Sequence, residues 1–249
     1  PTSELIALAL SHAYASQSRG DSLCWPSLRD GFIIPVDDVQ DLLPPVKVPD
    51  GESEEEPARA VRPDLLYVRL VPRGGLEFKF IEVKYRRHLR DARSPELVRG
   101  VDEQIGGLTK RWHAWYSGED IAPPFRATRR AKLARVLRFY TDKARRHADD
   151  TQGLSAESHQ ALLSEIDRMV EKGSDYDFAT EEAKGLGWIF CPEYAGQEPL
   201  DIAHNDWDAR IFLFGPRPLP DGPNPFAQPD PGPAPVKPPN ELPAEPSSQ

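Results

Sequence analysis

The chain has 249 residues, of which 39% are hydrophobic and 29% are charged, and this composition allows one large domain with a sizeable core. No apolar run approaches the roughly 20 residues that span a bilayer, so we expect no membrane partner. Cys24 and Cys191 are the only cysteines and lie far apart, which argues against a disulfide framework and favours a reducing, cytoplasmic location.

The N-terminal part predicts one helix and one short strand. Apolar residues at helical spacing predict a helix over 3–16, with Ser3 as its N-cap. The sequence GFIIPV predicts a strand over 31–36 that Pro35 interrupts. Residues 44–63 are rich in proline and acidic residues and predict an exposed loop.

A β-hairpin is predicted next. The segments 64–71 (DLLYVRLV) and 76–84 (LEFKFIEVK) are rich in aliphatic and aromatic residues, and Gly74-Gly75 between them predicts a turn. The segment 95–116 then predicts a helix with Ser94 as its cap and an apolar face. Further helices are predicted over 129–147 and 155–171, and further strands over 187–191 and 209–214.

From residue 216 onward the composition changes, because 13 of the last 34 residues are proline. Such a segment favours an extended, disordered tail. We therefore divide the chain into a domain over 1–215 and a tail or linker over 216–249. The tail is expected either to tether a further domain or to be a disordered terminus.

Positive charge is concentrated in one stretch of an acidic chain. Residues 84–147 contain seventeen Lys and Arg and seven Asp and Glu, a charge of +10. Because the whole chain has a net charge of −9, the remaining residues together carry −19. Clustered positive charge is what binding to a nucleic-acid backbone requires, although solvated helix faces also carry it. The candidates for phosphate contact are Arg86, Arg87, Lys110, Arg111, Arg129 and Arg130.

The chemistry is expected at the hairpin. Side chains on a strand alternate between its two faces, so Glu82 and Lys84 share one face, and Asp64 begins the neighbouring strand. Two convergent carboxylates suit Mg²⁺ or Mn²⁺, and the carbonyl of Val83 offers a further oxygen. Burying Glu82 and Lys84 costs several kcal/mol unless they are paired or bind a metal. An isolated ExK triplet is common by chance on solvated strands, so the apolar residues before Glu82 are what favours function.

The sequences RPDLLYV and FIEVKYR resemble the signature of the PD-(D/E)xK nuclease superfamily. The resemblance implies an α/β fold with a restriction-endonuclease-like αβββαβ core, here with a helical insertion at about 125–176. It also implies Asp64, Glu82 and Lys84 as catalytic residues. RecB- and Cas4-like members place a glutamine on the following helix in a QxxxY pattern; Gln104 matches it, whereas Leu108 stands where the tyrosine is expected. Glu4 is the candidate for a further acidic ligand from the first helix.

These features predict a Mg²⁺-dependent endonuclease that hydrolyses DNA, with RNA also open. The stretch from Val83 to Gln104 also resembles the nuclease part of ATPase-linked restriction factors, such as those that act with phosphorothioation systems. That likeness implies a module of a larger bacterial defence protein, with its ATPase outside this chain, which has no Walker A motif. Two alternatives remain: a non-catalytic nucleic-acid-binding module on a nuclease-like fold, and a scaffold domain that binds partners through its acidic loop and proline tail.

Overall fold

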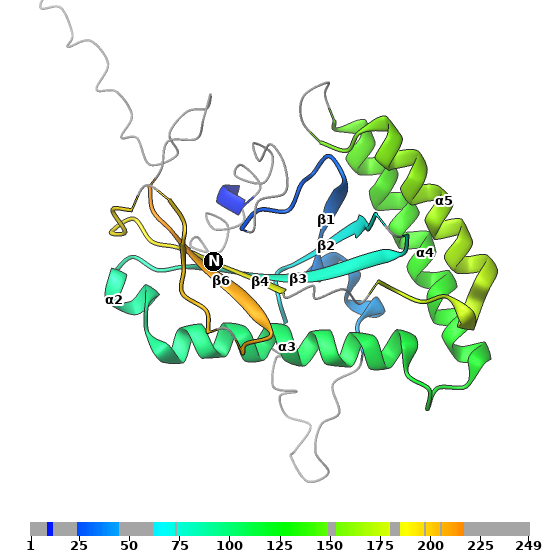
Figure 1. Cartoon of the computed structure of the whole chain (residues 1–249), viewed down its shortest axis with the longest axis horizontal. Helices are drawn as coiled ribbons and strands as arrows, with labels where there is room; N and C mark the ends of the chain where they lie inside the picture. Colours follow the sequence, from blue (N-terminus) through cyan, green and yellow to red (C-terminus); the bar gives the residue numbers. More distant parts are fainter. Residues whose placement is uncertain are drawn as a thin grey trace, which may run out of the picture.

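The computed structural model describes residues 9–11, 24–44, 62–72, 74–148, 153–179, 185–196, 198–204 and 206–216. A mixed sheet forms the centre of the described part, with one long helix across one face and a pair of helices at one end (Figure 1). Of the predicted N-terminal helix, residues 9–11 are helical and the others lie outside the described residues. The acidic segment at 51–57 and the tail from 217 onward also lie outside them.

The strands and helices follow one another in runs along the chain, with the main helices between β3 and β4. The strands are β1 (Gly31–Pro35), β2 (Leu65–Leu70), β3 (Leu76–Tyr85), β4 (Gly185–Phe190), β5 (Leu200–Asp201) and β6 (Ala209–Phe214). The helices are η1 (Val36–Leu42), α2 (Leu89–Ala92), α3 (Pro95–Ser117), α4 (Pro123–Arg146), α5 (Ala156–Lys172) and η2 (Gly173–Asp175).

The sheet has the order β1-β2-β3-β4-β6-β5. The first three strands form an antiparallel meander, β4 and β6 continue the sheet in parallel, and β5 adds an antiparallel edge. The predicted α/β class and the predicted hairpin are therefore confirmed. Gly74 and Gly75 form the turn with φ of 84° and 101°, a backbone conformation that glycine adopts without steric cost.

The helices predicted over 95–116 and 155–171 form close to their expected bounds. Ser94 caps α3 and Ser155 caps α5, each by accepting a backbone hydrogen bond. The start predicted for α4 at residue 129 was wrong, because the helix begins six residues earlier with proline at its first turn. Proline fits there because the first turn leaves its N–H groups unbonded in any helix. The short elements η1, α2 and β5 were not predicted.

The two faces of the sheet bury separate apolar clusters. Phe78 and Phe80 of β3 face a cluster that also takes in side chains of α3, α4 and α5. Ile81 and Val83, which alternate with them, face the second cluster on the opposite side, with Leu10 and Trp25. This alternation assigns Glu82 to the face that α3 covers.

Two glycines on β4 let α3 approach the sheet closely. A Cβ built on Gly185 would lie 2.1 Å from Ile105 Cγ2, and one built on Gly187 would lie 2.7 Å from Val101 Cγ1. Because these positions carry no side chain, the side chains of Ile105 and Val101 on α3 pack directly on the β4 backbone. The position of α3 relative to the end of β3 depends on this packing. No helix within the described ranges has the length and apolar character needed to cross a membrane.

Candidate active site

The pairing of β2 with β3 brings the two predicted carboxylates together. Leu65 pairs with Ile81, so the same register places Asp64 opposite Glu82 one step further along. Directly opposite residues of an antiparallel pair point to the same face. Asp64 is also held by the neighbouring strand, because its Oδ2 accepts a 2.7 Å hydrogen bond from the backbone N–H of Val83 in β3.

Glu82 lies at the centre of the site and is the most deeply buried of its charged groups. Its side chain is fully buried, whereas the side chain of Lys84 is 31% exposed. Lys84 Nζ forms an ion pair with Glu82 Oε1, and Gln104 Nε2 donates a 2.6 Å hydrogen bond to Glu82 Oε2. The structure thus brings together Asp64, Glu82, Lys84 and Gln104, which the sequence places up to forty positions apart.

The surroundings raise the pKa of Glu82 from 4.5 to about 8. Desolvation by burial is the larger cause, and the negative charge of Asp64 adds to it, while Lys84 acts in the opposite direction. The ionised form of the buried Glu82 carboxyl is therefore unfavourable unless a further positive charge lies next to it. A divalent cation between the two carboxylates would supply that charge.

The donor set fits a hard divalent cation in part. Within the described ranges no group of three or more His, Cys, Asp or Glu side chains could hold a metal ion. Asp64 and Glu82 would therefore hold it with the carbonyl of Val83 and with water, as Mg²⁺ sites with one or two carboxylates do. Glu4, the further ligand expected from the first helix, lies outside the described residues.

An open pocket of about 570 Å³ lies beside Lys84 and Gln104, along the exposed side of α3. We call it the α3 groove. Its lining includes Lys84, Gln104, Gly100, Glu103, Gly107 and Arg111. The groove therefore joins the candidate site to a surface that is large enough for part of a substrate. Gly100, Glu103 and Gly107 were not among the predicted site residues, although a glycine inside an amphipathic helix pattern is a signal that sequence inspection can detect.

One predicted phosphate contact has to be corrected. Arg130 is only 2% exposed, and its guanidinium donates hydrogen bonds to the backbone carbonyls of Tyr116 and Gly173. These bonds connect the end of α3 to the segment after α5, so Arg130 is an internal anchor and is not available to a phosphate. Basic residues at a helix junction satisfy exposed carbonyl groups as readily as they bind external anions.

The other predicted contacts occupy different surroundings. The guanidinium of Arg129 stacks 3.2 Å from the centroid of the Trp115 ring. Lys110 is exposed and forms a 2.8 Å ion pair with Asp208. Arg87 is exposed and Arg86 half-buried, both just beyond the end of β3. Arg111 alone of the predicted set lines the α3 groove.

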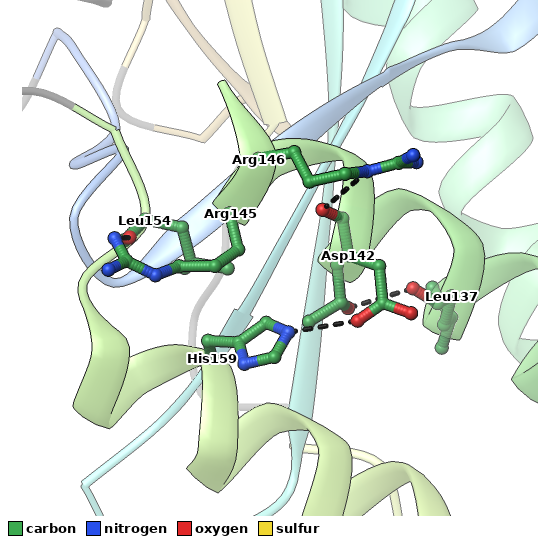
Figure 2. A network of polar contacts seen from close by, with 7 residues as sticks. Leu137, Asp142, Arg145, Arg146, Leu154 and His159 are labelled. Atoms are coloured by element: carbon green, nitrogen blue, oxygen red, sulfur yellow. Dashed lines mark hydrogen bonds and ion pairs between the residues drawn. The ribbon is translucent and has the colours of Figure 1, made fainter. Parts of the chain in front are cut away.

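Part of the basic segment holds α4 to α5. Figure 2 shows Arg145 donating to the carbonyl of Leu154 (3.1 Å) and a 2.9 Å contact between His159 Nε2 and Asp142 Oδ1. Arg138 likewise pairs with Asp167 of α5 at 2.5 Å. The +10 charge of residues 84–147 therefore overstates the positive charge that is free for a ligand.

Comparison of the chain with protein-family models, with curated proteins and with solved structures gave no match in any of the three.

Proposed function

We propose that this protein is a metal-dependent nuclease that hydrolyses phosphodiester bonds in DNA, with a core of the PD-(D/E)xK type. The observation that carries the proposal is the meeting of Asp64, buried Glu82 and Lys84 at the β2–β3 end. A strand that ends in a buried carboxylate beside a second carboxylate and an amine is costly to fold. Charged groups that destabilise the fold in this way are typical of sites where the same groups act on a ligand.

The order of the elements supports the same assignment. The antiparallel meander β1-β2-β3, the helix α3 and the parallel strand β4 follow the βββαβ part of the expected core. The α4–α5 pair stands between α3 and β4 as the expected helical insertion, over 123–172 rather than about 125–176. Gln104, which matches the glutamine of the RecB-like pattern, donates a hydrogen bond to Glu82.

Each residue of the candidate site has a separate role in the proposed hydrolysis. Asp64 and Glu82 would hold Mg²⁺ or Mn²⁺, which when bound supplies an electrophile for the phosphate and lowers the pKa of water. Gln104 orients the Glu82 carboxylate through its hydrogen bond. Lys84 orients the attacking water and offsets the negative charge that develops on the phosphate. The water oxygen bonds to phosphorus, the bond to the leaving oxygen breaks, and a proton passes to that oxygen.

The decisive experiment measures cleavage and binding separately. Purified protein is incubated with plasmid and with single-stranded DNA in Mg²⁺, Mn²⁺ or EDTA, and Lys84→Ala is compared with Lys79→Ala. Lys79 is a suitable control because it lies on the same strand and faces away from the site, paired with Glu77. We expect metal-dependent cutting that Lys84→Ala abolishes and Lys79→Ala retains, while both variants still bind DNA.

A second measurement tests the metal site without relying on activity. Calorimetric titration with Mn²⁺ should show binding to the wild-type protein and its loss in Asp64→Asn. DNA binding with neither cleavage nor Mn²⁺ binding would instead favour a non-catalytic binding module, and the absence of all three would favour a scaffold. The narrower expectation is a defence-protein module that acts with an ATPase in the same or an associated chain, and it rests on the resemblance of residues 83–104. The expected cytoplasmic location rests on the two widely separated cysteines.

A further inference from the structure

Two glycines of α3 have no explanation inside the described fold. Gly100 and Gly107 are exposed in the middle of the helix, and a Cβ built on either would meet no atom within 4 Å. Gly106 differs, because its Cβ would lie 2.4 Å from Asp208 Oδ2. A mid-helix glycine costs about 1 kcal/mol relative to alanine. Gly100 and Gly107 therefore reduce helix stability and relieve no contact that the structure describes.

Both unexplained glycines line the α3 groove and lie one helical turn on either side of Glu103. The carboxylate of Glu103 is exposed in the groove, whereas that of the other acidic lining residue, Glu96, accepts a 2.8 Å hydrogen bond from Ser94 Oγ. Glu103 is thus an acceptor with open space on both sides along the helix.

A buried polar atom of one lining residue and the candidate catalytic carboxylate lie at the same groove. Arg111 Nε is buried and has no hydrogen-bond partner within the described ranges. Glu82 does not line the groove, but two lining residues, Lys84 and Gln104, contact its carboxylate. The groove therefore leads from an unsatisfied guanidinium nitrogen to the candidate catalytic carboxylate.

We propose that the α3 groove binds an unpaired base that carries an exocyclic amine, next to the phosphate that Lys84 faces. The groove is concave, so it suits an extruded or single-stranded nucleotide better than a stacked base pair. The two carboxylates of its lining, Glu96 and Glu103, would repel a row of backbone phosphates. A carboxylate accepts from the N4 amine of cytosine, and thymine has no equivalent amine. This inference rests on the proposed function only for where the phosphate lies.

A base bound in the α3 groove accounts for the presence of glycine at positions 100 and 107. The half-buried side chain of Leu97 and the bare Cα atoms of Gly100 and Gly107 leave a surface against which a flat base can lie. Arg111 contributes a donor for the neighbouring phosphate or for a base acceptor. A side chain at either glycine would occupy the space of the base while leaving the helix itself undisturbed.

The test measures binding to a short oligo-dC, to an oligo-dT of equal length and to a blunt duplex, by fluorescence anisotropy in EDTA so that no cleavage occurs. Wild-type protein should bind oligo-dC at least about fivefold more tightly than oligo-dT, as expected for hydrogen bonds to a charged acceptor. It should bind the duplex more weakly than oligo-dC. Glu103→Gln should remove the preference for oligo-dC. Equal binding of oligo-dC and oligo-dT, or tighter binding of the duplex, would overturn the inference.

The glycines allow a second test that separates binding from folding. Gly107→Leu should weaken oligo-dC binding at least about tenfold while thermal stability stays equal or rises, because leucine favours helix. Ala131→Leu, at an exposed position of α4, is the matched control and should leave binding unchanged. Unchanged oligo-dC binding in Gly107→Leu would refute the pocket even if cleavage is observed. Absence of cleavage with these binding effects intact would refute only the nuclease proposal.

Discussion

Gln104 Nε2 lies 2.6 Å from Glu82 Oε2, and this hydrogen bond connects the middle of α3 to the end of β3. The two residues are 22 positions apart, and no local element joins them. The bond satisfies one oxygen of a fully buried carboxylate, while Lys84 pairs with the other. Glu82 is therefore oriented by one neutral and one charged partner, from two different elements.

Removing this orientation should reduce activity more than stability. In Gln104→Ala, Glu82 keeps its ion pair with Lys84 but loses the contact that sets its rotation. We expect Mg²⁺-dependent cleavage to fall about 10–100-fold, as is typical when a residue that orients a metal ligand is removed. Steady-state cleavage and Mn²⁺ titration measure the effect. Gln40→Ala, at an exposed position of η1, is the control and should match the wild type; equal activity in both variants would contradict the orienting role.

The raised pKa of Glu82 predicts how the metal-free protein responds to pH. Between its ordinary pKa of 4.5 and its folded value of about 8, the folded state holds a proton that the unfolded state has released. The stabilising contribution of Glu82 is therefore complete below pH 4.5 and is lost as pH rises to 8. The slope cannot exceed about 1.4 kcal/mol per pH unit for one proton. Urea unfolding in EDTA should show wild type losing stability relative to Glu82→Gln over this range. Parallel pH profiles would refute the assignment.

The packing of α3 on β4 predicts opposite effects for two glycine-to-alanine changes. Gly185→Ala places a methyl group against Ile105 and should destabilise the protein by about 1–3 kcal/mol. Gly107→Ala meets open space and should stabilise it by up to about 1 kcal/mol. Thermal unfolding of the two variants measures the difference. A Gly185→Ala protein as stable as wild type would mean that α3 does not pack so closely on β4.

Arg130 should affect folding and not nucleic-acid binding. Arg130→Ala leaves the carbonyls of Tyr116 and Gly173 without their donor in a buried junction, at an expected cost of about 3 kcal/mol. Arg135→Ala, an exposed change on the same helix, should cost nothing measurable. Denaturant unfolding gives the stability, and anisotropy with labelled DNA gives the affinity of the folded fraction. Weakened DNA binding by folded Arg130→Ala would restore the discarded phosphate contact.

Periodicity and cap residues determined most of the secondary structure in advance. Alternation along β3 already assigned Glu82 and Lys84 to the face of Phe78 and Phe80, because side chains on a strand alternate whatever they pack against. Ser94 and Ser155 marked the starts of α3 and α5. The start of α4 was predicted six residues late, at residue 129, although Pro123 and Pro124 suit a first helical turn.

The sequence by itself determined which groups carry the candidate chemistry and on which side of the hairpin they lie, since both follow from residue type and strand period. Only the tertiary structure decided what surrounds them. The close approach of α3 that Gly185 and Gly187 permit, the contact of Gln104 with Glu82, and the burial of Arg130 all join residues distant along the chain. Such contacts depend on the packing of whole elements, which a local pattern of charge or apolar residues does not specify.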